Sequence, residues 1–208
     1  KYASPLAIWS IFSWIHISVD IWAINYYLGS NVMAGYYLAS RLSTFPIILL
    51  STILTSFFIP IAYEKSNSTS DPNYKKSFII ISFCILIYCI GILFLESIYF
   101  FFHNEIMVTM SNDKYSSSSN LIPLLTLTWA LFYLGQLITC YGYVLCKPEI
   151  YIFPKISSSI LALLGVIYFT YKYGVFGPII GLTIAGVNYC LTTILATIRS
   201  YRRTQYII

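Results

Sequence analysis

Residues 13–42 read SWIHISVDIWAINYYLGSNVMAGYYLASRL. Two apolar runs flank the short polar turn GSN at residues 29–31, which predicts two antiparallel helices joined by a tight hairpin. An aspartate, Asp20, lies inside the first run, and an arginine, Arg41, lies inside the second. A charge at the centre of a bilayer costs about 2.5–3.5 kcal/mol on insertion scales. This hairpin therefore bears on both the fold class and the candidate site.

The composition of the whole chain is typical of a membrane protein. Of its 208 residues, 58% are hydrophobic and only 9% are charged, whereas a soluble domain carries about 25% charged residues. Such a chain cannot cover a globule with polar surface, so we expect an all-α integral membrane protein. The sequence starts with Lys1, with no signal peptide pattern before the first apolar run, and we expect it to be part of a longer protein.

Six apolar runs are each long enough for a transmembrane helix, which needs about 20 residues. They lack the polar–apolar alternation of barrel strands, and in lipid only a helix satisfies its own backbone groups. We therefore predict a single transmembrane domain over residues 1–208, built as a six-transmembrane-helix bundle. The predicted spans are residues 5–28, 32–63, 77–102, 121–146, 151–171 and 175–198, with polar loops at 64–76 and 103–120.

Basic residues gather in alternate loops of this arrangement. If the N-terminus is cytoplasmic, only Lys114 and Lys172 lie in loops on the opposite side. Because positively charged residues prefer cytoplasmic loops, we predict that both ends of the chain are cytoplasmic. Nine basic residues then fall on the cytoplasmic side: Lys1, Lys65, Lys75, Lys76, Lys147, Lys155, Arg199, Arg202 and Arg203.

The sequence offers little for metal, cofactor or ATP chemistry. His16 and His103 are too far apart in the chain to form a metal cluster alone. No glycine-rich phosphate loop is present, so we expect neither a cofactor nor direct use of ATP, and the confinement of basic residues to loops argues against nucleic acid. We expect buried free thiols at the five cysteines, which form no C-x-x-C pair: Cys84, Cys89, Cys140, Cys146 and Cys190.

Several neutral side chains in the predicted spans fit helix packing better than a ligand role. Small residues repeat every four positions in the last span, which predicts close contact with another helix. Polar side chains in the fourth and sixth spans are expected to form hydrogen bonds between helices. The small residues are Gly177, Gly181 and Ala185, and the polar ones are Gln136, Asn188 and Thr192.

The two charges of the first hairpin are expected at similar depth. Asp20 lies about 13 Å before the turn at Gly29, and Arg41 about 15 Å after its end at Asn31, at 1.5 Å per residue. His16 lies one helical turn from Asp20 on the same face. Three interpretations stay open: a hydrated cavity with a charged wall, an Asp20–Arg41 ion pair that joins two helices, or an Arg41 side chain that reaches the outer interface.

The order of Asp20, Gly29, Gly35, Tyr37 and Arg41 resembles the hairpin that opens the second half of polysaccharide flippases. These proteins belong to the multidrug/oligosaccharidyl-lipid/polysaccharide exporter superfamily. The stretch YKYGVFGPIIGLTIAGV at residues 171–187 is similar to the last connection and helix of that family. Many relatives carry an arginine directly after the aspartate, where this chain has Ile21.

The resemblance implies half of a two-bundle transporter, with this chain as the C-terminal bundle and a missing N-terminal six-helix bundle as its partner. The implied function is alternating-access export of undecaprenyl-pyrophosphate-linked oligosaccharide across the bacterial inner membrane, for O-antigen, lipopolysaccharide or capsule. Implied partners are the lipid-linked cargo, membrane lipid and the pathway's polymerase and chain-length proteins.

The residues of the implied cavity would have separate roles. Arg41 would hold the pyrophosphate and Asp20 would take up and release a proton. The remaining cavity residues would be His16, Asn25, Trp22 and Tyr37, with aromatic rings available to sugars.

Other functions remain as alternatives. A multidrug exporter of the same superfamily, which exchanges organic cations, would favour acids and aromatic rings in its cavity, and Arg41 argues against it. A membrane-embedded glycan polymerase or acyltransferase would need reactive groups in an outer loop, and residues 103–120 contain no nucleophile–base pair. A scaffold subunit explains the charges within the spans least well. We therefore expect a transporter and not an enzyme.

Overall fold

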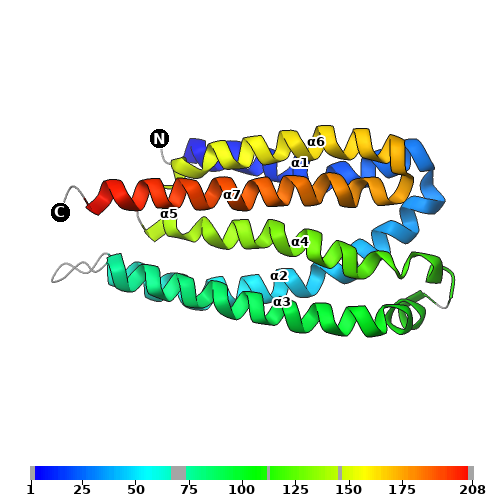
Figure 1. Ribbon diagram of the computed structural model, residues 1–208, viewed down its shortest axis with the longest axis horizontal. Coiled ribbons are helices and arrows are strands. Elements are labelled where there is room, and N and C mark those ends of the chain that lie inside the picture. The colour runs from blue at the N-terminus through cyan, green and yellow to red at the C-terminus, as the bar shows by residue number, and fades with distance from the viewer. Residues whose placement is uncertain (1–2, 67–73, 112, 145–146, 206–208) are drawn as a thin grey trace.

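The computed structural model describes residues 3–66, 74–111, 113–144 and 147–205, and within them the side chains of residues 10–201. Every regular element in these ranges is a helix, as the composition predicts. The α-helices are α1 (Ala3–Leu28), α2 (Ser30–Ser66), α3 (Tyr74–Ser111), α4 (Leu121–Ile138), α5 (Cys140–Val144), α6 (Ile152–Tyr173) and α7 (Gly177–Gln205) (Figure 1). Three short 3₁₀ turns join them: η1 (Ser116–Ser118), η2 (Pro148–Tyr151) and η3 (Gly174–Phe176).

Four helical segments in the described part of the chain are long and apolar enough to cross a membrane. They are Ser30–Ser66, Tyr74–Ser111, Leu121–Val144 and Pro148–Tyr201, which together indicate a membrane protein. The last segment contains both α6 and α7, joined through η3. The all-helical prediction is confirmed, while six separate crossings remain a prediction.

The surface of α3 supports a membrane environment. Leu93, Phe94 and Phe101 are 67%, 69% and 72% exposed. Soluble proteins rarely expose contiguous apolar surface of this kind, because burying it from water is favourable. Lipid tails are as apolar as these side chains, so the same surface is stable in a bilayer.

The long helices run back and forth along one axis (Figure 1). α1 begins and α7 ends at the same end, here called the termini end; the turn at Gly29, η1 and η3 lie at the other, here called the hairpin end. α6 packs along α7, α1 packs on α6, and α4 packs on α7. α2 packs between α3 and α4 and also touches α1, so the helices other than α3 close a ring around a packed interior.

Three helices, α2, α3 and α7, extend beyond their predicted spans by three or more residues at one end or both. α3 continues to Ser111, so residues 103–111 of the predicted loop are helical; this segment contains no glycine or proline to end the helix. α2 runs through Pro46 and Pro60 and changes direction along its length (Figure 1). Of the predicted loop at 64–76, residues 67–73 lie outside the described residues, and those on either side are helical.

The small residues of α7 pack closely against α6. A Cβ at Gly181 would lie 2.5 Å from the Val166 nitrogen and 2.7 Å from the Gly165 carbonyl carbon, closer than atoms can approach. One turn further on, the Ala185 carbonyl accepts a hydrogen bond from Ser158 Oγ at 3.0 Å. The predicted close contact is therefore confirmed, and its partner is α6.

The neutral polar residues divide between two roles. Gln136 accepts a hydrogen bond from the Tyr189 hydroxyl at 3.4 Å, and Asn188 donates one to Ser157 at 3.2 Å, so both join helices as predicted. The prediction is wrong for Thr192, whose hydroxyl donates to the Asn188 and Tyr189 carbonyls of its own helix. Threonine in a helix has these carbonyls within reach of its short side chain.

The cysteines within the described residues carry free thiols. Cysteine side chains of this kind behave as small apolar groups in a core. The free thiols are Cys84, Cys89, Cys140 and Cys190, of which all but the half-buried Cys89 are buried as predicted. Cys146 lies outside the described residues.

Candidate functional site

One face of α1 places two titratable side chains inside the bundle. His16 and Asp20 are both 1% exposed and lie four residues apart, one turn along the same face. Because this face packs against the other helices, an ionisable group on it needs partners from those helices to offset the loss of water.

Asp20 finds its side-chain partner on α2. The hydroxyl of Tyr36, itself fully buried, donates to Asp20 Oδ2 at 3.0 Å, and the Ile21 N–H donates to Oδ1 at 2.8 Å. A phenol and a backbone amide thus bind the two oxygens of one carboxyl group. This hydrogen bond is a polar link between the facing sides of α1 and α2.

Arg41 does not share this place. Tyr36 lies at the level of Asp20, so Arg41, five residues later, lies about 7.5 Å further along α2 and is rotated by about 140°. Its side chain is exposed, with Cζ 4.8 Å from the ring centroid of Tyr37. Within the described part of the chain, the Asp20–Arg41 ion pair that the sequence allows is not formed. The number of residues from the turn predicts a similar depth for Asp20 and Arg41. It does not predict the rotation about the helix axis that separates their side chains.

A third buried titratable group comes from α6. Lys155 is 1% exposed, with Nζ 4.2 Å from the ring centroid of Phe132 and 4.9 Å from that of Tyr189. His16 stacks on the same Phe132, with ring centroids 4.3 Å apart. The aromatic rings of α4 and α7 thus bring a lysine and a histidine together in the interior.

The sequence predicts Lys155 only as one of nine basic residues on the cytoplasmic side, at the start of the span 151–171, whereas the structure buries its side chain. Lys155 belongs to the first helical turn of α6, directly after the buried Pro154, and its side chain points into the bundle. The signal in the sequence was a lysine four residues inside a predicted span, where a buried cation usually marks function. A basic residue near a span end is normally assigned to the loop, so this signal was missed.

The interior group therefore has two connected parts, together called the inner cluster: Asp20 with Tyr36, and Lys155 with Phe132 and His16. His16 Nδ1 in this cluster, and Nε1 of Trp129 whose ring lies beside that of His16, are buried without a hydrogen-bond partner in the described part of the chain. Most buried polar atoms in proteins are hydrogen-bonded. These two groups therefore keep hydrogen-bonding capacity that no described residue uses.

The other four predicted site residues lie on the outside of the same two helices. Trp22 is 53% and Tyr37 40% exposed, and Asn25 and Arg41 are exposed as well. We call these four residues the outer α1–α2 face. In Figure 1, α1 lies behind α6, and much of α2 lies behind α3. The predicted site residues therefore lie in two places. His16 and Asp20 lie in the interior, and the other four lie on the outer α1–α2 face.

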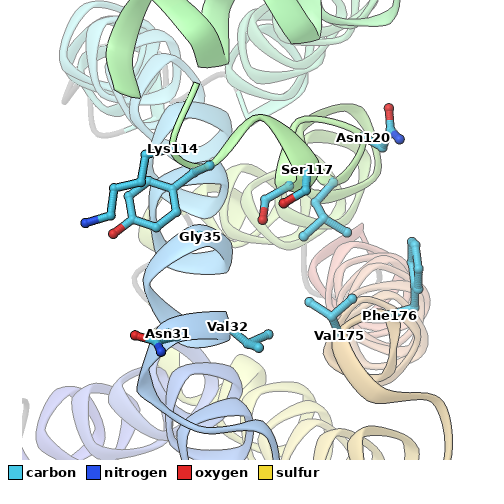
Figure 2. Close-up of a pocket in the computed structure, with 11 residues that line it drawn as sticks. Asn31, Val32, Gly35, Lys114, Ser117, Asn120, Val175 and Phe176 are labelled. Atoms are coloured by element: carbon cyan, nitrogen blue, oxygen red, sulfur yellow. The ribbon is translucent and has the colours of Figure 1, made fainter. Parts of the chain in front are cut away.

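A separate pocket of about 670 Å³ opens at the hairpin end. Figure 2 shows that it lies between the start of α2, the segment around η1, and η3. Three segments distant in the chain meet there, so the sequence alone carried no signal for it. Its lining residues are Asn31, Val32, Gly35, Lys114, Tyr115, Ser117, Ser118, Asn120, Leu121, Val175 and Phe176.

Compared with known protein families, with curated proteins and with solved structures, the chain matches none. The described residues also contain no group of three or more His, Cys, Asp or Glu side chains placed to hold a metal ion. The site is therefore defined by its own geometry: an inner cluster, an outer α1–α2 face and a pocket at the hairpin end.

Proposed function

We propose that this chain is the C-terminal half of a membrane transporter that moves an anionic, lipid-linked oligosaccharide. Two kinds of support converge. The first hairpin resembles that of polysaccharide flippases, and the outer α1–α2 face presents polar and aromatic side chains on membrane helices. In this proposal the missing N-terminal bundle covers that face, and the cargo passes between the two halves.

The exposed Arg41 is the observation that carries the proposal. It lies within a candidate membrane span and is exposed. A lipid-facing arginine at the centre of a bilayer costs about 2.5–3.5 kcal/mol or more. A polar path, or a second protein unit that lines one, removes this cost. An Arg41 side chain that reaches the outer interface would also lower this cost, but it would give the residue no part in glycan export.

The chemistry of the face suits the proposed cargo. The planar guanidinium of Arg41 matches two oxygens of a pyrophosphate at once. Trp22 and Tyr37 present rings on which sugars can pack, and Asn25 offers both donors and acceptors to sugar hydroxyls. Asp20 is enclosed beside Tyr36, so proton exchange there would require the contact between α1 and α2 to open.

The proposed topology is six crossings with both ends in the cytoplasm of a bacterium, and the protein in its inner membrane. α6 and α7 lie side by side and run in opposite directions, so the last long segment crosses twice in this proposal (Figure 1). Because Lys155 is buried, it does not count among the basic residues that set the orientation. The other basic residues still favour the termini end as the cytoplasmic side, because Lys65, Lys75 and Lys147 lie there.

The test uses the full-length gene in cells that need it for their surface glycan. We expect Arg41→Ala to reduce surface glycan at least tenfold at normal protein level, and Arg41→Lys to restore part of it because it keeps the charge. Lys172→Ala, an exposed cation at the hairpin end, is the matched control and should leave the glycan unchanged. Normal glycan in the Arg41→Ala strain would refute the proposal.

Organic-cation exchange is the second candidate, and the aromatic side chains of α1 are the observation in its favour. Trp14 and Trp22 are both exposed, with ring centroids 5.0 Å apart, and such rings attract organic cations. Dye efflux separates the two functions. If the protein confers dye efflux and Arg41→Ala increases that efflux, the result would support the antiporter and contradict the glycan proposal.

A further inference from the structure

The pocket at the hairpin end is preformed. From residue 113 to residue 122 the backbone makes i→i+3 hydrogen bonds in close succession, including Ser116 N to Asp113 O at 3.2 Å and Ser118 N to Tyr115 O at 2.9 Å. These bonds hold one wall of the pocket in shape without a ligand. The volume of about 670 Å³ lies within the range of about 300–1,000 Å³ typical of small-molecule sites.

The lining combines an apolar base with hydrogen-bonding groups at its edge. Val32 and Val175 face each other across the pocket, and Ser117 lies on its η1 side (Figure 2). Asn31 and Asn120 belong to the lining on two sides. Amides and hydroxyls both donate and accept hydrogen bonds, so this edge suits a ligand whose groups do the same.

The charge of the lining residues restricts the class of ligand that the pocket can bind. Lys114 is the sole charged side chain among the described lining residues, and no carboxylate accompanies it in the lining. A cationic ligand would find no carboxylate there to balance its charge, whereas an anionic ligand can pair with Lys114 and a neutral ligand needs no counter-charge. Phe176, at the η3 side, is 48% exposed and offers an aromatic surface at the edge.

We propose that this pocket binds a glycan, with room for one or two neutral or acidic sugar rings. A pyranose has an apolar C–H face and a rim of hydroxyls, which matches the valine base, the aromatic edge and the amide and hydroxyl groups. The pocket shares no residue with the outer α1–α2 face. Glycan binding here is therefore separate from the transport proposal, and either can fail without the other.

The test is direct binding to the purified full-length protein in lipid nanodiscs. The probe is an array of purified neutral and acidic oligosaccharides, followed by solution titration of the best binder. We expect Phe176→Ala to weaken that binding about tenfold. Tyr173→Ala is the matched control, because Tyr173 is also 48% exposed, belongs to the same turn region and does not line the pocket. It should change the affinity by less than twofold.

A second variant keeps the test decisive if Phe176→Ala misfolds. Lys114→Met changes an exposed loop residue, and we expect it to reduce binding of acidic glycans at least fivefold while neutral glycans bind as before. Three results would overturn the proposal: no glycan bound by the wild type, equal binding by the Phe176→Ala and Tyr173→Ala variants, or displacement by inorganic phosphate but not by free neutral sugar. The last result would assign the pocket to a phosphate group instead.

Discussion

At the scale of single residues, the interior is organised by which polar groups reach one another. Asp20 is satisfied by the hydroxyl of Tyr36 and by a backbone amide, not by the only arginine in the same hairpin. A buried carboxyl group without partners would cost several kcal/mol, so Tyr36 is as much a part of the site as Asp20. Arg41 is left exposed on the outside of the hairpin.

We predict that Tyr36→Phe lowers the free energy of unfolding by about 1–3 kcal/mol, the typical cost of leaving a buried polar group without its partner. Tyr37→Phe is the control, since Tyr37 is 40% exposed and its change should stay within about 0.5 kcal/mol. Thermal unfolding of the purified variants in detergent measures both. Equal effects of the two substitutions would show that the bond to Asp20 does not stabilise the fold.

Substitutions of Lys155 separate the contribution of its packing to stability from that of its charge. Methionine has nearly the same length, fills the same space beside Phe132 and contacts aromatic rings favourably. We expect Lys155→Met to be at least as stable as the wild type, and Lys155→Ala to be less stable than Lys155→Met by about 2 kcal/mol or more because it leaves a cavity. Unfolding in denaturant measures the difference. If methionine destabilises as much as alanine, the charge itself holds the cluster together.

At the scale of helices, small residues decide which pairs come close. Gly29, with φ of +86°, ends α1 and lets α2 start at once, so the first hairpin is tight. Gly165 and Gly181 allow the backbones of α6 and α7 to touch. In lipid such contacts replace the hydrophobic effect as the source of helix association.

We predict that Gly181→Val disrupts the α6–α7 pair. A Cβ there would collide with the backbone of Gly165 and Val166, which cannot move aside as a side chain can. The expected loss is about 3 kcal/mol, at the upper end of typical overpacking costs. Ile180→Val, the neighbouring position with the same final residue, should cost less than half as much; comparable unfolding temperatures for the two variants would contradict the close contact.

At the scale of the whole molecule, two ends with different chemistry emerge. Most of the exposed basic residues lie toward the termini end, while the hairpin end carries the pocket with Lys114. Because the helices alternate in direction, each loop belongs to one end. Assigning the termini end to the cytoplasm therefore fixes the side of every loop in the proposed orientation.

Labelling with a membrane-impermeant thiol reagent tests that orientation. In a cysteine-free full-length background, we expect Ser117→Cys to react in intact cells and Glu64→Cys to react only after the membrane is permeabilised. Both side chains are exposed, so accessibility reports sidedness and not burial. Labelling of both positions, or of Glu64→Cys alone, in intact cells would reverse or break the proposed topology.

The sequence by itself determined the helical class, most helix bounds, the tight turn at Gly29 and the close packing of the last helix. Each of these depends on local or one-dimensional information: runs of apolar residues, glycine conformation and four-residue spacing. It also placed His16 and Asp20 on one face, because that needs only the 3.6-residue period.

Only the tertiary structure decided which residues meet. The pairing of Asp20 with Tyr36 depends on the rotation of α2 about its axis, and the burial of Lys155 depends on Phe132 and Tyr189 from two other helices. The pocket at the hairpin end likewise needs three segments more than fifty residues apart to come together. Spacing along one helix cannot specify these contacts, because they are set by how each helix is rotated and seated against its neighbours.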